Sequence, residues 1–248
     1  MSKVKIELVS IGHLPLEFNS KNMSGFSSSL FEVVGGVDNL ALRCNSDGES
    51  WEFSDSLLKD QMPMQISDAA DFRIAIVNVP LEDDWYSRRL DDKQIVITFH
   101  EIKEILQFSN IPLENVVYRL LNAYALSYKR ARNKLPTSDS MIDFTHDETR
   151  GCLFDMNGLK SDLVASCHRP IICDECKERL RRDKISDNEI KAVEKDIKKI
   201  QKDLYYRILD QVRLHPIWAL VLSSFFAFIL GVSGSIVGSY IFEYMKKM

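Results

Sequence analysis

The N-terminal half of the chain alternates short apolar runs with polar turns, a pattern that predicts strands joined by loops. KIELVSI, LALRC and SWEFS have the length of strands, and Gly35-Gly36 supplies a turn among them. FRIAIVNVP is a nearly continuous β-branched and apolar run, typical of a strand buried on both faces. Residues 95–99 (IVITF) form a second such run. We therefore expect a buried sheet in this half.

Helical spacing follows in the middle of the chain. HEIKEILQF predicts a short helix with Ile102, Ile105 and Leu106 on one face. Residues 113–134 predict a long helix, because apolar positions recur every three or four residues and basic residues gather at the C-terminal end. The expected fold class is α+β, with a mixed α/β domain over residues 1–182.

A charged helix with a regular apolar seam is predicted after this domain. Ser186, Asp187 or Asn188 can cap its N-terminus. Its apolar residues then alternate at intervals of three and four, as in the a/d seam of a short coiled coil: Ile190, Val193, Ile197, Ile200 and Leu204. We expect a helical stalk over 186–214 that associates with a second copy. The alternative is a single helix packed back on the domain.

The C-terminal segment from Ile217 to Phe242 carries no charged residue over 26 positions. As a helix it would be about 39 Å long, enough to cross a hydrocarbon core of about 30 Å. Trp218 and Tyr240 lie near its two ends, where interfacial aromatic residues are common. We predict a transmembrane helix over 217–242 and a short tail over 243–248. The alternative is a buried core helix.

Charge predicts the orientation of this anchor. Lys and Arg exceed Asp and Glu over residues 177–213, whereas only Lys246 and Lys247 follow the anchor, and no signal peptide is visible. The positive-inside rule then places the N-terminal domain in the cytoplasm, where disulfides are rare. The net negative charge of residues 1–176 argues against a nucleic-acid partner.

Small residues within the anchor suggest self-association. Gly234 and Gly238 form a GxxxG pair, which lets two helix backbones approach closely in lipid. Such pairs are common in membrane helices. This one follows the predicted coiled-coil seam of the preceding helix, which strengthens the case for association. A homo-oligomer assembled through stalk and anchor is the resulting prediction.

Candidate chemistry is concentrated in residues 146–176, which hold four of the five cysteines. Cys173 and Cys176 form a CxxC, a spacing that presents both sulfur atoms to one metal ion. His146 and Cys152 are the candidates for the two further ligands of a tetrahedral site. Zinc suits thiolate and imidazole ligands, so we predict a structural zinc knuckle that adds on the order of 10 kcal/mol to folding.

Other arrangements of this segment stay open. Cys167 and His168 are rival ligands, since they lie only a few residues before the CxxC. The cysteines can also be present without metal, or serve a catalytic or redox reaction. Acidic residues stand between the CxxC cysteines and would raise their pKa, which disfavours a redox pair. Cys44 lies apart and is expected to be a small core residue.

The chain from Ile95 through the CxxC segment resembles the archaemetzincin-type zincin metallopeptidases. In that family a strand precedes a helix bearing HExxHxxGxxH, whose histidines hold a catalytic zinc, and four cysteines further on hold a structural zinc. IVITF corresponds to the strand, LENVVYRLLNAYALSYKR to the helix, and ICDECKERL to the closing CxxC segment.

The departures from that pattern concern the catalytic residues. The helix contains no histidine, and Asp147 stands where the family has its first structural cysteine. Without two helix histidines and the glutamate between them there is neither a catalytic zinc nor a general base. The resemblance thus implies a degenerate relative that kept the structural metal and lost the peptidase, with His146 as the fourth ligand.

These expectations favour a non-enzymatic protein: a membrane-anchored cytoplasmic sensor, adaptor or effector stabilised by zinc. Its expected partners are membrane lipid, a second copy, and an unidentified cytoplasmic protein or small molecule. The layout alone suggests bacterial defence. One alternative is a membrane-tethered zinc hydrolase with His146 as ligand and Glu148 as base. Another is a membrane-permeabilising defence effector, which the small residues of the anchor suggest.

Overall fold

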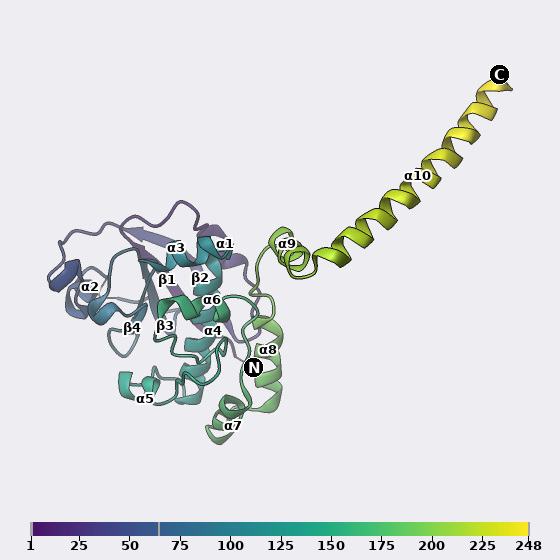
Figure 1. The fold of residues 1–248 in the computed structure, drawn as a ribbon. Coiled ribbons are helices and arrows are strands. Elements are labelled where there is room, and N and C mark those ends of the chain that lie inside the picture. Colours follow the sequence, from purple (N-terminus) through teal and green to yellow (C-terminus); the bar gives the residue numbers. More distant parts are fainter. Residues whose placement is uncertain (1, 64, 248) are drawn as a thin grey trace. The chain divides into compact units, whose positions relative to one another are not determined.

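The structure is a computed structural model that describes residues 2–63 and 65–247. Its internal contacts divide the chain into two compact units, Met1–Lys202 and Asp203–Met248. The first is built around a five-stranded sheet, and the described part of the second consists of two helices (Figure 1). The predicted mixed α/β class, with a C-terminal apolar helix, is confirmed.

The sheet is mainly parallel. Its strands are β1 (Val4–Ile11), β2 (Phe31–Leu40), β3 (Phe72–Val77), β4 (Ser87–Arg89) and β5 (Gln94–Thr98). Their order is β2-β1-β3-β5-β4, and only β4, at one edge, is antiparallel to its neighbour. Every residue of β3 and β5 is buried, so both predicted strands with two covered faces are confirmed.

Helices cover the two faces unequally. The helices of the first unit are α1 (Lys21–Gly25), α2 (Asp55–Asp60), α3 (Ile102–Phe108), α4 (Glu114–Arg130), α5 (Ser138–Ile142), α6 (Leu163–Ser166), α7 (Asp174–Arg182) and α8 (Asp187–Ile197). Ile74 and Ile76 of β3 enter the larger core with α1, α3, α4 and α6, while Ala75 and Val77 enter a smaller core with α2. The predicted helices at HEIKEILQF and 113–134 are confirmed as α3 and α4.

Three local predictions in the N-terminal half are wrong. LALRC is not a strand, because β2 ends at Leu40. SWEFS contains a 3-10 turn at Glu49–Trp51, where Ser50 and Trp51 have φ of 55° and 67°, outside the extended region. Gly35-Gly36 is a bulge inside β2 and not a turn, since the register moves from Glu7↔Val34 to Leu8↔Val37.

The predicted stalk over 186–214 is two helices in different units. Ser186 and Glu189 form a capping box that starts α8. Helix α8 ends at Ile197, and α9 (Leu204–Leu214) begins the second unit. Four of the five seam residues are buried in the larger core of the first unit: Ile190, Val193, Ile197 and Ile200. These four are therefore not free to form a seam with another chain, which corrects the coiled-coil interpretation.

Asp196 anchors α8 through polar contacts as well. Its carboxylate accepts hydrogen bonds from the backbone N–H of Ser29 at 2.5 Å and from the Ser29 hydroxyl at 2.6 Å. Lys199 pairs with its other oxygen at 2.8 Å. Burial alone would raise the pKa of Asp196, but Lys199 and Ser29 lower it. The α8 segment is thus joined to the loop that precedes β2.

The second unit has the composition of a membrane segment. Helix α10 (Pro216–Lys246) starts at a proline in its first turn and is the one described helix long and apolar enough to cross a membrane. A stretch of 18 residues within this helix has a mean hydropathy of 2.2, and none of these residues is buried in the structure. In α9 the seam residue Leu204 is 62% exposed, together with Ile208 on the same helical face.

We expect Ile197→Ala to lower the free energy of unfolding by about 2–5 kcal/mol, because the side chain is 1% exposed in the core. Ile208→Ala, at a 55% exposed site, is the matched control and should change it by less than about 0.5 kcal/mol. Denaturant unfolding of the full chain at two protein concentrations checks this. An effect of Ile197→Ala that depends on concentration would favour the coiled coil instead.

Candidate metal centre

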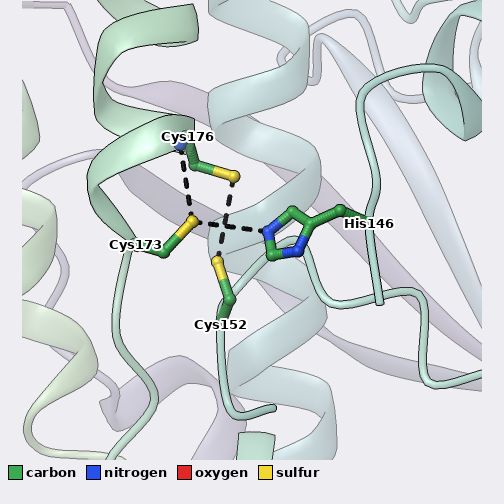
Figure 2. A group of neighbouring side chains, drawn as sticks. All are labelled: His146, Cys152, Cys173 and Cys176. Atoms are coloured by element: carbon green, nitrogen blue, oxygen red, sulfur yellow. Dashed lines mark hydrogen bonds between the residues drawn. The ribbon is translucent and has the colours of Figure 1, made fainter. Parts of the chain in front are cut away.

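Four side chains of the 146–176 segment converge on one point. They are His146, Cys152, Cys173 and Cys176, and one ligand atom of each lies within 4.8 Å of all the others (Figure 2). His146, Cys152 and Cys176 are buried, and Cys173 is partly buried. The structure thus brings together the two CxxC cysteines and both candidates for the remaining ligands.

The CxxC is positioned by the start of helix α7. Cys173 is its N-cap residue, and its Sγ accepts the backbone N–H of Cys176 at 3.4 Å. Cys176 therefore lies in the first turn with its sulfur beside that of Cys173 (Figure 2). A thiolate at this place also benefits from the positive end of the helix dipole.

The other two ligands are held by short backbone pairings in place of regular strands. The N–H of His146 bonds to Phe154 O at 3.2 Å, and the carbonyl of His146 accepts Met156 N–H at 3.0 Å. Cys152 forms an isolated bridge with Ile171, just ahead of the CxxC. These pairings fold the segment back on itself, so that ligands distant in sequence meet.

Asp155 braces the same loop and was missed by the sequence analysis. Its carboxylate accepts the backbone N–H of Gly151 at 3.1 Å and of Asn157 at 3.0 Å. An aspartate that binds the backbone two residues further on is a common turn signal. The sequence therefore contained a local signal for this residue, though not for its link to the ligands.

The ligand separations fit a tetrahedral ion. Zinc–sulfur bonds of about 2.3 Å at tetrahedral angles place two sulfur atoms about 3.8 Å apart. The sulfur atoms of Cys152 and Cys176 are 3.9 Å apart, and Cys173 Sγ is 3.4 Å from His146 Nε2. All five cysteines, which lie in the described part of the chain, are free. Three sulfurs and one imidazole form a donor set that zinc prefers.

The protonation of the cysteines also suits a cation. The hydrogen bond with Cys176 lowers the pKa of Cys152, which favours a thiolate in this pair of sulfur atoms. The same bond, with burial, raises the pKa of Cys176, and burial raises that of Cys173. A metal ion would replace the protons of these two thiols, because only deprotonated sulfur binds it well.

The second nitrogen of His146 faces away from the sulfur atoms (Figure 2). Nδ1 is buried without a hydrogen-bond partner, and Glu148 Oε2 lies 3.4 Å from it without hydrogen-bond geometry. Metal-binding histidines usually donate their other N–H to a carboxylate or carbonyl. Glu148 is placed to accept that proton after a small movement, since its side chain is 78% exposed.

The rival ligands lie outside the cluster. Cys167 is fully buried in the larger core, and burial raises its pKa to about 12. Its carbonyl accepts the side-chain N–H of Asn115 on α4 at 2.9 Å. His168 Nδ1 instead accepts the backbone N–H of Lys202 at 3.1 Å. Cys44 packs against the smaller core.

The comparisons with known proteins show a weak structural likeness. No protein-family profile and no curated protein matches the chain. Among solved structures, the chain is similar to the crystal structure of archaemetzincin from Methanopyrus kandleri, with a TM-score of 0.45 and 17% sequence identity. The likeness covers 73% of this chain and 95% of that one. A likeness of this extent transfers no residue role to this chain.

We expect the purified full chain to contain one zinc ion per molecule, and Cys173→Ser to remove the metal and lower the melting temperature, because one ligand is lost. Cys167→Ser is the matched control: it changes a fully buried cysteine outside the cluster and should keep the zinc. Metal content by mass spectrometry and thermal unfolding check both. Full zinc occupancy in Cys173→Ser would contradict the assignment.

Proposed function

We propose that this chain is a membrane-anchored, zinc-stabilised protein that acts by binding a partner and not by catalysis. The observation that carries the proposal is the closed cluster of His146, Cys152, Cys173 and Cys176. Structural zinc sites use four protein ligands, whereas catalytic sites keep one position open for water or substrate. Four buried or partly buried ligands correspond to the structural kind.

The hydrolase alternative fits this geometry less well. It needs Glu148 beside a metal-bound water, but Glu148 Oε2 lies 3.4 Å from Nδ1 of His146. That nitrogen faces away from the sulfur atoms (Figure 2). Helix α4 carries no histidine that could bind a second ion. A relative of the zincin peptidases that retained only its structural metal is consistent with both facts.

The membrane part of the proposal rests on α10 and its flanks. A helix of 31 residues exceeds the roughly 20 residues that a bilayer crossing needs. The basic residues before it favour placement of the first unit in the cytoplasm. The first unit would then be tethered at the membrane surface as a sensor or adaptor. Self-association would use Gly234 and Gly238, because the residues of α8 are engaged in the core.

Glu148→Gln separates the two functional classes. If the zinc is structural, the variant keeps its zinc and changes the free energy of unfolding by less than about 0.5 kcal/mol, because the side chain is 78% exposed. Metal content, thermal unfolding and the phenotype of cells that express the protein are the measurements. A lost phenotype with unchanged zinc and stability would favour the hydrolase. Cys173→Ser serves as the positive control for metal loss.

The double substitution Gly234→Leu and Gly238→Leu should reduce crosslinked dimer several-fold, because the larger side chains separate the two helix backbones. Crosslinking of the full chain in membranes measures this. Val232→Phe, on the opposite side of α10 at 100° per residue, is the control and should leave the dimer intact. Finding only monomer in the unsubstituted protein would refute self-association.

A further inference from the structure

A cavity of about 330 Å³ lies in the first unit, apart from the metal ligands. Its walls are the edge strand β4 with the preceding turn, one side of helix α4, the α5 segment, and residues 153–156 of the metal-binding segment. The volume is at the small end of the ~300–1,000 Å³ found for ligand pockets. A small molecule of modest size would fill it.

Arg119 of α4 places a buried positive charge in the wall of this cavity. Its side chain is 1% exposed, and it makes no ion pair with any residue that the structure describes. Its guanidinium donates to Tyr86 Oη at 3.2 Å and to the Asp155 carbonyl at 2.7 Å. Nε is buried without a hydrogen-bond partner. Buried charges are normally paired, because an unpaired one loses its hydration without compensation.

None of the other charged groups of the cavity forms an ion pair with Arg119 in the described part of the chain. Arg88 is paired with Asp55 at 2.8 Å and with Asp83 at 3.0 Å. The carboxylate of Asp155 accepts backbone N–H groups and makes no ion pair with Arg119, so its charge acts on the guanidinium only through space. Arg89 bonds to an exposed aspartate, yet its Nε is also buried without a partner. The wall therefore keeps two buried N–H donors without a partner, the Nε groups of Arg119 and Arg89.

The charge is stable in this environment. Burial penalises the charged form of Arg119, but the hydrogen bond to Tyr86 and the negative charge of Asp155 favour it, and the pKa of Arg119 lies above its ordinary value. The guanidinium also lies over the Tyr86 ring, 5.7 Å from its centroid. These contacts fix the position of the group, so an incoming anion would meet a donor that is already oriented.

The remainder of the lining is mainly apolar. Trp85, Leu120, Met141, Phe144, Phe154 and Met156 supply most of it. Phe154 and Met156 are also the residues whose backbones bond to the metal ligand His146. One apolar wall of the cavity is therefore held in place by the same segment that holds the metal ligands.

We propose that this cavity binds a small organic anion whose carboxylate or phosphate reaches the Arg119 guanidinium and whose apolar body lies against the Trp85, Phe144 and Met156 side. The proposal deepens the sensor function above by giving its ligand class, and it rests on that function only for its biological meaning. The cavity and the buried arginine stand whether or not the chain is anchored or self-associated.

The test uses the full chain, with its zinc, in phosphatidylcholine nanodiscs, and fluorine NMR of three probes. Para-trifluoromethyl benzoate and para-trifluoromethyl phenyl phosphate are the anionic probes, and they distinguish a carboxylate from a phosphate ligand. Para-trifluoromethyl benzamide is the uncharged match. We expect line broadening with at least one anion, none with the amide, and none with empty nanodiscs. Absence of binding by both anions at millimolar concentration would overturn the proposal.

Two variants locate the site. Arg119→Lys keeps the charge but loses the planar fork, and should weaken anion binding about tenfold. Ala123→Leu fills the cavity from α4 and should abolish it, whereas Ala192→Leu, at a half-buried helical site on α8 away from the cavity, should not. Unchanged binding in both Arg119→Lys and Ala123→Leu would refute the location. Zinc content, measured on each sample, separates this result from a failure of the metal site.

Discussion

The interaction that organises residues 146–176 is the meeting of His146, Cys152, Cys173 and Cys176. The segment that carries them forms only isolated bridges and short helices, so few of its backbone groups are held by regular structure. A cation shared by the four ligands would join three separate parts of the segment and remove much of the freedom of the unfolded chain. Helix α7 contributes to this centre by ordering the CxxC at its first turn.

Helix α4 connects the centre to the rest of the molecule. One side of it packs against the larger core, and Asn115 binds the carbonyl of Cys167. Its Arg119 binds the carbonyl of Asp155 in the loop of the metal ligands. The same helix thus supports the metal-binding segment and one wall of the cavity.

The two units differ in the surroundings that suit their apolar side chains. The first buries alternating strand residues on both faces of a sheet and depends on packing, capping and buried polar contacts. In the second, α10 gains nothing from internal burial, since its apolar window is entirely unburied. Its composition matches a lipid surrounding, in which a helix satisfies its own backbone hydrogen bonds. The proposed function combines the two: recognition by the first unit and tethering by the second.

The sequence by itself determined the features that depend on local pattern: the doubly covered strands β3 and β5, helices α3 and α4, the apolar helix α10, and the CxxC spacing. It did not reveal the bulge at Gly35-Gly36, because glycine can adopt the φ of +75° seen at Gly35 in a turn and in a bulge alike.

The sequence also could not place Ile190, Val193, Ile197 and Ile200. Apolar residues at intervals of three and four can pack against a second chain or against the body of the same chain. Tertiary structure decided that choice, and it also chose His146 and Cys152 over Cys167 and His168 as neighbours of the CxxC. The sequence shows that Arg119 is a basic residue among apolar ones on α4. Only the three-dimensional packing shows that it is buried beside a cavity and forms no ion pair with a described residue.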